Sequence, residues 1–400
     1  MKLEHSDILI IGAGPAGAVA AGLLKKQGHQ VLIIEKETFP RFSIGESLLP
    51  QSMAYIEEAG MLQDVVEAGF QHKNGAAFAR GDLRTAFDFR DKFSCGWGTT
   101  YQVQRAHFDK VLADAAQKAG AEIRYRHTVT GVDVAGAQPQ VTARTPQGEE
   151  YVVQARHLLD ASGFARILPR MLGLERPSGF PVRAALFTHV EDRIAAQDMD
   201  RDKILISVHP EHRHVWFWTI PFSNGRSSQG VVATPEFLER HAGSEVERLR
   251  AIIAETPSLA HVLRNATWDT PGRSITGYAA NVTALWGKGF ALLAEMEADS
   301  LRLQRELVAH TSHVYSLLGP FSIAEDVRTG RLQAARIVNP ECRRHVTLAL
   351  PKQGQLTPAC KIVAQLIQET VESWGHQLSE PAPQREAASA RRAPTPSAEP

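Results

Sequence analysis

The stretch Asp7–Glu35 reads DILIIGAGPAGAVAAGLLKKQGHQVLIIE and decides the fold of the N-terminal part of the chain. The apolar run Asp7–Ile11 predicts a buried strand, and a second apolar run ends on the acidic residue Glu35. Between them, three glycines precede a segment rich in alanine and leucine, which favours a helix. The order of strand, glycines, helix, strand and terminal acid predicts a βαβ unit that binds a dinucleotide.

The glycines of this unit have separate roles. Gly12 allows the tight turn after the first strand, Gly14 lets the backbone approach a pyrophosphate, and Gly17 lets the helix pack close to the sheet. The N-terminus of the helix offers unpaired N–H groups and a partial positive charge to phosphates. Glu35 is placed to accept hydrogen bonds from a ribose 2′-hydroxyl. A glycine-rich turn without a ligand is the alternative. The predicted cofactor contacts are Gly12, Gly14, Pro15, Ala16, Gly17 and Glu35.

The composition bounds the remaining possibilities. With 400 residues and 43% hydrophobic content, the chain is long enough for one large or two medium domains with a core. Lys+Arg and Asp+Glu balance at 44 each, so no global field favours nucleic acid or an anionic membrane. Three scattered cysteines argue against a disulfide scaffold and against a Cys-rich metal site. The longest uncharged run contains the glycine motif and is no membrane span, so we expect a soluble cytoplasmic protein.

Two further segments give the chain a specific resemblance. FPRFSIGESLLP occupies residues 39–50, and QVQRAHFD occupies residues 102–109. Together with GAGPAG, they resemble the flavin-dependent halogenases and their geranylgeranyl-reductase-like relatives over about residues 5–293. The resemblance implies that FAD is the cofactor. It also implies an α/β fold for residues 1–293, with a Rossmann-like FAD-binding sheet and an antiparallel substrate sheet over about residues 175–285.

The same resemblance implies cofactor-binding residues outside the first motif. Arg105 is expected near the flavin or its phosphates, as the matching arginine is in relatives, and a surface arginine at a helix start is the alternative. The segment VVQARHLLDASG at residues 152–163 predicts a strand followed by small residues, which permit a close approach to the cofactor. An ordinary strand and turn is the alternative there. The implied residues are Arg41, Gly45, Glu46, Ser47, Arg105, Asp160 and Gly163.

Lys73 lies in the segment AGFQHKNGAAF and is the implied catalytic residue. In the halogenases, a lysine at the corresponding place receives or orients the hypochlorous acid made at the flavin. A partly desolvated amine with a lowered pKa suits that task, because burial disfavours the ammonium form. Most lysines are solvated surface charges, and that is the alternative for Lys73.

The segment WFWTIP at residues 216–221 matches the WxWxIP pattern of the same halogenases. On a strand, Trp216 and Trp218 point to one face and Phe217 to the other, and we expect the two indoles to stack as a rigid apolar wall. In the family, this wall is thought to separate the flavin from the organic substrate. Paired aromatics that simply fill a sheet core are the alternative.

The segment HPEHRH contains the alternating histidines His209, His212 and His214. Such spacing in a hydrophilic turn more often indicates solvated histidines than metal ligands. We therefore predict no metal site.

The chain changes character near residue 293. Relatives carry a glycine–aspartate motif after a strand like Gly289–Leu293, and here AEMEADS follows instead. Residues 294–376 resemble the C-terminal part of a LysR-type effector-binding domain, a truncated α/β tail without the DNA-binding winged helix. Residues 377–400 are expected to form a disordered tail, because they contain almost no large apolar residue. A chimeric chain is the simplest account.

The expected function is that of an FAD-dependent oxidoreductase or monooxygenase of the halogenase type, acting on an electron-rich aromatic small molecule. A single dinucleotide motif agrees with a separate flavin reductase as the partner that supplies FADH₂. The missing glycine–aspartate motif predicts an impaired flavin site. The alternatives are a flavin hydroxylase or alkene reductase on the same scaffold, and a non-catalytic ligand-binding or regulatory protein.

Overall fold

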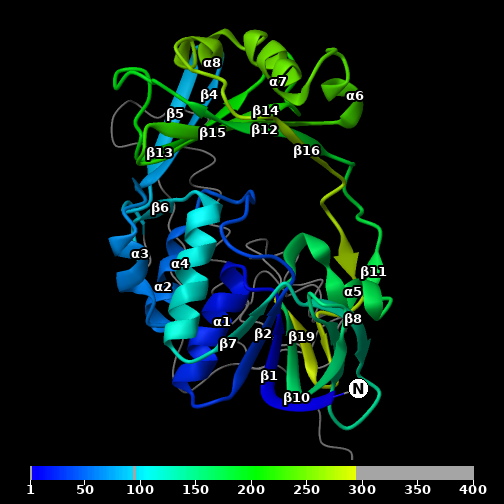
Figure 1. Cartoon of the computed structure of the whole chain (residues 1–400). Helices are drawn as coiled ribbons and strands as arrows, with labels where there is room; N and C mark the ends of the chain where they lie inside the picture. The colour runs from blue at the N-terminus through cyan, green and yellow to red at the C-terminus, as the bar shows by residue number, and fades with distance from the viewer. Residues whose placement is uncertain (1, 93–95, 294–400) are drawn as a thin grey trace, which may run out of the picture. The chain divides into compact units, whose positions relative to one another are not determined.

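The computed structural model describes residues 2–92 and 96–293, which belong to the first of two units of the chain (Figure 1). The predictions made for residues 294–376 and 377–400 lie outside the described residues.

An eight-stranded sheet contains the first βαβ unit. Its strands are β1 (Lys2–Ile11), β2 (Val31–Glu35), β7 (Glu122–Tyr125), β8 (Thr128–Asp133), β9 (Gln140–Arg144), β10 (Glu150–Asp160), β18 (Trp286–Gly287) and β19 (Phe290–Leu292). The parallel part has the order β19-β10-β1-β2-β7, and β18 adds an antiparallel edge. The long strand β10 also belongs to an antiparallel meander with β9 and β8.

The predicted βαβ unit is confirmed, with one difference at its start. β1 begins at Lys2 and not at Asp7, because it runs beside the long strand β10 from the pair Lys2 and Tyr151 onward. β2 ends on Glu35, as predicted.

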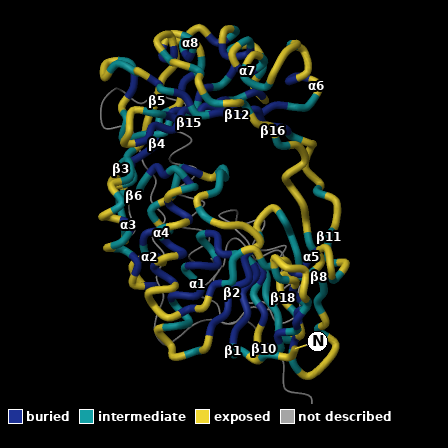
Figure 2. The backbone as a smooth tube through the Cα atoms, in the orientation of Figure 1, coloured by how far each residue is buried: buried dark blue, intermediate teal, exposed yellow. Residues whose placement is uncertain are grey.

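Both faces of this sheet are covered, which explains why its central strands are continuously apolar (Figure 2). On one face, Ile10 and Ile33 pack with Phe108 of a helical layer. On the other, Leu9 and Ile34 pack against the meander and a short helix. The helices of the first layer are α1 (Pro15–Lys26), α2 (Pro50–Glu58), α3 (Leu62–Glu67) and α4 (Arg105–Lys118), and the short helix is α5 (Ile167–Met171).

A seven-stranded sheet forms the other half of the unit. Its order is β16-β12-β15-β14-β13-β4-β5, and its neighbours are antiparallel except for β13 and β4, which are parallel. The strands are β4 (Gly75–Arg80), β5 (Leu83–Asp88), β12 (Ala184–Glu191), β13 (Lys203–Val208), β14 (Trp216–Pro221), β15 (Arg226–Ala233) and β16 (Arg273–Thr276). The sheet therefore takes in a hairpin that lies far upstream of the expected boundary near residue 175.

Three helices cover one face of the seven-stranded sheet. They are α6 (Pro235–Leu238), α7 (Glu245–Ala254) and α8 (Pro257–Val262), and Phe217 and Val231 of the sheet share a core with Ile252 of α7. The opposite face carries Phe187, against which Phe42 from the loop after β2 packs. This loop thereby joins the two sheets.

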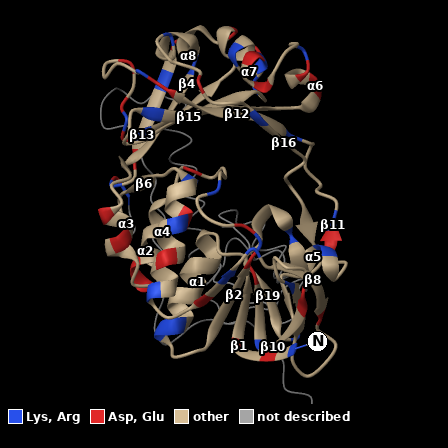
Figure 3. Ribbon diagram, viewed as in Figure 1, with Lys and Arg blue, Asp and Glu red and all other residues tan. Residues whose placement is uncertain are grey.

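The remaining elements are two short antiparallel pairs and one turn of 3₁₀ helix. β3 (Gln71–Lys73) pairs with β6 (Thr100–Gln102), β11 (Glu175–Arg176) pairs with β17 (Asn281–Val282), and the 3₁₀ turn spans Gly163–Ala165. Both α4 and α7 carry acidic and basic side chains (Figure 3). Within residues 2–92 and 96–293, no helix is long and apolar enough to cross a membrane.

Candidate functional site

The turn after β1 has the geometry that its glycines predict. Gly12 has a φ of +97°, which L residues rarely adopt, and a Cβ there would lie 2.6 Å from the carbonyl oxygen of Ala161. A Cβ on Gly17 would collide with the carbonyl oxygen of Gly12. Gly14 is different, because a Cβ there would approach only the Arg41 side chain, at 3.5 Å. Gly12 and Gly17 are thus required by packing, whereas the space in front of Gly14 is open.

The N-terminus of α1 is open to an anion. α1 starts at Pro15 after the N-cap Gly14, with no side-chain cap and no acidic residue in its first turn. The Glu35 carboxylate accepts hydrogen bonds from the backbone nitrogens of Ala13, at 2.8 Å, and Glu37, at 2.9 Å. Each carboxylate oxygen keeps a further lone pair, so Glu35 can also accept a hydroxyl.

Arg41 lies beside this turn with an unsatisfied donor. Its terminal nitrogen is 4.0 Å from Glu35 and 3.6 Å from Asp109. Its buried Nε lies 3.8 Å from Glu37 but has no hydrogen-bond partner among the described residues. Buried polar groups almost always form hydrogen bonds, so this nitrogen is available to donate to a ligand atom. An open helix N-terminus, an unpartnered guanidinium nitrogen and an acid at the end of β2 together fit a dinucleotide.

Arg105 stabilises the loop after β2 through protein contacts. It is the first residue of α4 and donates to both carboxylate oxygens of Asp109, at 2.6 and 3.1 Å, and to the carbonyl oxygen of Ile44, at 2.5 Å. Gly45 has a φ of +91°, and a Cβ there would lie 2.9 Å from the Arg105 guanidinium. The predicted surface alternative for Arg105 is wrong, because its side chain is only 10% exposed.

Glu46 and Ser47 continue the same loop. The buried Glu46 carboxylate lies 2.7 Å from Nε2 of His189, which belongs to β12. Ser47 forms an isolated β-bridge with Gln102 of β6. A cavity of about 510 Å³ opens beside this loop. Its lining includes Phe42, Glu46, Arg105, His107 and His189.

Asp160 and Gly163 shape the turn that faces Gly12. The two carboxylate oxygens of Asp160 accept hydrogen bonds from the backbone nitrogens of Ser162 and Leu168, each at 2.8 Å. Gly163 has a φ of +56° and begins the 3₁₀ turn. The small residue Ala161 between them makes the contact with Gly12.

Lys73 is buried, and no carboxylate among the described residues forms an ion pair with it. Its side chain is among the largest fully buried ones, and the residue is 2% exposed. Nζ donates to the carbonyl oxygen of Leu48 at 2.7 Å and lies 5.0 Å from the centre of the Phe89 ring. Burial lowers the pKa of Lys73 from 10.5 to about 8. Thr100, its cross-strand neighbour, has a buried hydroxyl that finds no hydrogen-bond partner in the part of the chain that the structure describes.

Trp216 and Trp218 lie on the same face of β14, with Phe217 on the other, as predicted. The predicted stacking of the indoles is wrong, because the ring planes are tilted by 52° with centroids 6.1 Å apart. Side chains two residues apart on a strand are separated by about 6.6 Å, too far for parallel stacking. The Trp218 ring instead lies over Gly230 and donates from Nε1 to Ser228 at 3.0 Å.

The prediction of solvated histidines is wrong for His209. This residue is 2% exposed, and its Nε2 lies 3.1 Å from Glu255. Its Nδ1 accepts hydrogen bonds from the backbone nitrogens of Glu211 and His212. Among the residues that the structure describes, no group of three or more His, Cys, Asp or Glu could hold a metal ion.

A family model described as the FAD binding domain matches residues 5–294. The chain belongs to this FAD-binding family. FAD is the cofactor of this flavoprotein, as the sequence predicts.

The flavoprotein is similar to flavin-dependent halogenases. It is 30% identical to a tryptophan 2-halogenase of Chondromyces crocatus over 311 residues, covering 74% of this chain but only 57% of that enzyme. Its fold matches a flavoprotein/dehydrogenase of Cytophaga hutchinsonii with a TM-score of 0.69 and 44% identity, covering 72% of this chain and 70% of the other. The myxobacterial chondrochloren halogenase CndH matches with a TM-score of 0.65 and 27% identity, covering 82% and 79%. The predicted halogenase-type kinship and α/β fold are confirmed.

Three groups in this region were not among the predicted site residues. The Leu48 carbonyl that binds Lys73 belongs to the main chain and carries no sequence signal. His189 is a single histidine in a mostly apolar strand, which offered nothing to select it. Asp109 had a usable signal, because its spacing of four residues from Arg105 on a helix predicts an ion pair.

Proposed function

We propose that this flavoprotein is a halogenase-type FAD-dependent oxidoreductase that passes oxidised halogen through Lys73 to an electron-rich aromatic small molecule. The observation that carries the proposal is the buried amine of Lys73, which has a main-chain carbonyl as its acceptor. A buried lysine that has no counter-ion within residues 2–92 and 96–293 is rare and costs free energy, so a functional role accounts for its presence.

The residues around the glycine turn are proposed to hold FAD. Gly14, the first turn of α1 and Arg41 would hold the pyrophosphate, and Glu35 would accept a hydrogen bond from the ribose. The remaining residues act by shaping this cradle and the loop beside it: Gly12, Pro15, Ala16, Gly17, Gly45, Glu46, Ser47, Arg105, Asp160 and Gly163. When bound and reduced by a separate flavin reductase, FAD supplies the reaction with oxygen that oxidises a halide ion to hypohalous acid.

Lys73 supplies a nucleophilic nitrogen. With a pKa of about 8, a useful fraction of its amine is neutral near neutral pH. The nitrogen lone pair bonds to the halogen as the oxygen–halogen bond breaks, and the released hydroxide takes a proton from nitrogen and leaves as water. An aromatic carbon then bonds to the halogen as the nitrogen–halogen bond breaks. The ring proton returns to the amine.

The wall of Trp216 and Trp218 is proposed to keep the aromatic substrate away from the flavin. The two indoles lie on the face of the seven-stranded sheet that Phe42 and Ile44 also contact. Two indoles on one rigid strand form an apolar surface on which an aromatic ring can lie.

The test uses the purified flavoprotein with FAD, a flavin reductase, NADH, bromide and phenol as the aromatic probe. Wild-type protein is expected to give bromophenol, and Lys73→Ala is expected to bind FAD equally while giving none. Lys118→Ala removes a lysine whose side chain is 77% exposed and is the matched control. A product that gains oxygen without halogen would instead identify a hydroxylase. Absence of FAD binding in a titration would favour a non-catalytic protein.

A further inference from the structure

The strand that carries Lys73 is too short to fix its own position. β3 has three residues, and β6 is its only partner among the described strands, with Lys73 opposite Thr100. Two-stranded pairs of this size have little independent stability. Other contacts must therefore determine where the backbone of Lys73 lies.

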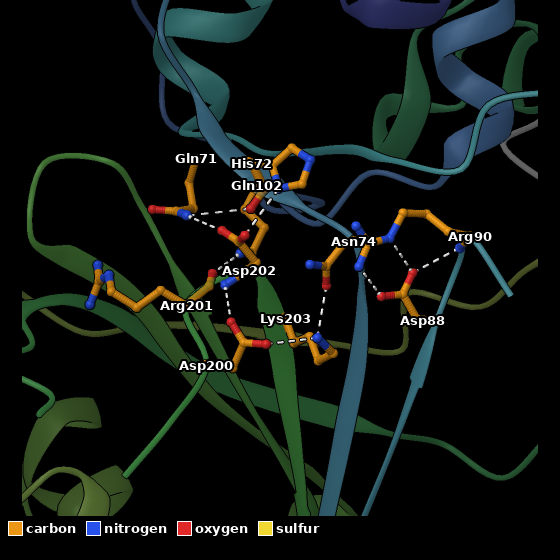
Figure 4. A network of polar contacts seen from close by, with 10 residues as sticks. All are labelled: Gln71, His72, Asn74, Asp88, Arg90, Gln102, Asp200, Arg201, Asp202 and Lys203. Carbon is orange, nitrogen blue, oxygen red and sulfur yellow. Dashed lines mark hydrogen bonds and ion pairs between the residues drawn. The ribbon is translucent and has the colours of Figure 1, made fainter. Parts of the chain in front are cut away.

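Asp202 contacts the residues on both sides of Lys73 (Figure 4). Gln71 donates from Nε2 to the Asp202 carboxylate at 3.0 Å, and Nδ1 of His72 lies 3.2 Å from its second oxygen. On the other side of Lys73, the backbone nitrogen of Asn74 donates to the main-chain oxygen of Asp202 at 2.8 Å. One residue therefore holds the strand before and after the lysine.

The residues next to Asp202 in the sequence also contact β6 and the residue that follows β3. The buried Gln102 of β6 donates from Nε2 to the main-chain oxygen of Arg201 at 2.8 Å. Lys203 donates to the Asn74 side chain at 2.9 Å and to Asp200 at 2.7 Å. The turn of residues 200–203 thus binds both β3 and β6, as Figure 4 shows.

This turn is itself fixed to the seven-stranded sheet. Lys203 begins β13, which pairs with β4 directly after Asn74. The Arg201 guanidinium donates to Asp192 at 2.8 Å and to the carbonyl oxygen of Phe222 at 2.8 Å. The seven-stranded sheet therefore fixes the position of the turn, and through the turn that of β3.

We propose that Asp202 is a positioning residue for Lys73, acting through Gln71, His72 and the backbone of Asn74. The inference rests on the proposed function of Lys73 but concerns its placement. Asp202 is bonded to the neighbours of Lys73, whereas Nζ is bonded to Leu48. Displacement of a reacting group by about 1 Å costs on the order of 10²-fold in rate, so anchoring on both sides has a catalytic consequence.

The variants separate position from charge. Asp202→Ala removes both side-chain contacts and leaves the backbone contact. Asp202→Asn removes the charge but keeps an oxygen for Gln71 and an N–H group for His72. Asp269→Ala is the matched control, because Asp269 pairs with Arg226 on the same sheet and its side chain is 44% exposed, against 40% for Asp202.

The experiment measures how fast acetic anhydride acetylates Lys73, resolved by peptide mass spectrometry at one pH on the full chain. In Asp202→Ala, the rate is expected to rise roughly five- to tenfold, the effect of losing a side-chain hydrogen bond on a local opening equilibrium. Asp202→Asn and Asp269→Ala are expected to stay near the wild-type rate. An unchanged rate in folded Asp202→Ala would overturn the proposal.

Two further arms keep the outcome interpretable. If Asp202→Ala does not fold, the double variant Gln71→Ala with His72→Ala removes the same contacts from the other side and should show the same increase; no increase would overturn the proposal. In the bromination assay, Asp202→Ala should lower kcat with little change in KM. Faster acetylation in a protein that does not halogenate would support the positioning while rejecting the proposed function.

Discussion

The Nζ atom of Lys73 donates a 2.7 Å hydrogen bond to the carbonyl oxygen of Leu48. This bond joins the short strand β3 to the loop that leads from β2 of the eight-stranded sheet to α2. The same loop is held by Arg105 at Ile44 and by His189 at Glu46. A shift of the loop is therefore expected to change the surroundings of the Lys73 amine.

The depressed pKa of Lys73 predicts a pH dependence of stability. Its folded-state value is about 8 and its ordinary value is 10.5. Between these values the unfolded chain keeps the proton that the folded chain has lost, so the free energy of unfolding rises with pH in this window. Relative to Lys73→Met, the wild-type free energy of unfolding should rise by roughly 3 kcal/mol across it, measured by urea denaturation.

A surface lysine supplies the comparison for this experiment. Lys118→Met, at a side chain that is 77% exposed, should track the wild-type curve closely. Parallel curves for wild type and Lys73→Met would show that burial does not disfavour the ammonium form.

The open space in front of Gly14 predicts that one glycine can be replaced without loss of the fold. Gly14 has a φ of −67°, which alanine adopts freely. Gly14→Ala should leave the melting temperature within about 4 °C of wild type. It should weaken FAD binding by at least about tenfold, because the methyl group occupies the approach to the pyrophosphate.

Titration with FAD and thermal melting test this prediction. Gly179→Ala is the control, since a Cβ at Gly179 meets nothing within 4 Å. Gly17→Ala should behave in the opposite way and destabilise the fold, because its Cβ collides with the Gly12 carbonyl. Normal FAD affinity in Gly14→Ala would place the pyrophosphate elsewhere.

The contact between Glu46 and His189 predicts an energetic coupling. The two side chains lie 2.7 Å apart, and Glu46 is 2% exposed. A double-mutant cycle with Glu46→Gln and His189→Phe should give a coupling free energy of about 1.5–3 kcal/mol, as expected for a hydrogen bond to a charged group. Additive changes in the free energy of unfolding would mean that the loop is held without this pair.

The close contact of Trp218 with Gly230 predicts that a side chain at position 230 will disturb the proposed substrate wall of Trp216 and Trp218. Gly230→Ala should displace the indole, because the new Cβ would lie only 2.1 Å from Cζ2 of the Trp218 ring. The expected cost is about 1–3 kcal/mol of stability, together with a changed tryptophan emission and a lower yield of halogenated product. Ala143→Gly changes a buried position on β9, in the core that Leu9 and Ile34 share in the eight-stranded sheet, and should leave the emission unchanged.

The parts of the fold that follow from local pattern were predictable. The strand that ends at Ile11 and the one that ends at Glu35 are apolar because both faces are buried, and the glycines between them have few other uses. Lys73 and the tryptophans were selected through resemblance, since burial of a lysine leaves no trace in composition or periodicity.

The parts that depend on distant pairing were not predictable. The membership of β4 in the second sheet depends on its parallel pairing with β13, and no local pattern in Gly75–Arg80 specifies that partner. The tilt of the indoles depends on Gly230 and Ser228 of the next strand. The partner of the buried His209 is Glu255, the C-cap of α7, which lies 46 residues along the chain.

The parallel pairing of β13 with β4 makes the second sheet inseparable from the rest of the flavoprotein. The chain first contributes β4 and β5 to this sheet. It then forms α4 and the strands β7 to β10 outside it, returns to form β12 to β16, and afterwards forms β19 of the other sheet. A fragment of residues 175–285 transplanted into another flavoprotein would arrive without two of its strands and with β13 as an open edge. The second sheet therefore cannot be exchanged between relatives as one continuous segment, because the exchange also has to include the hairpin of residues 75–88.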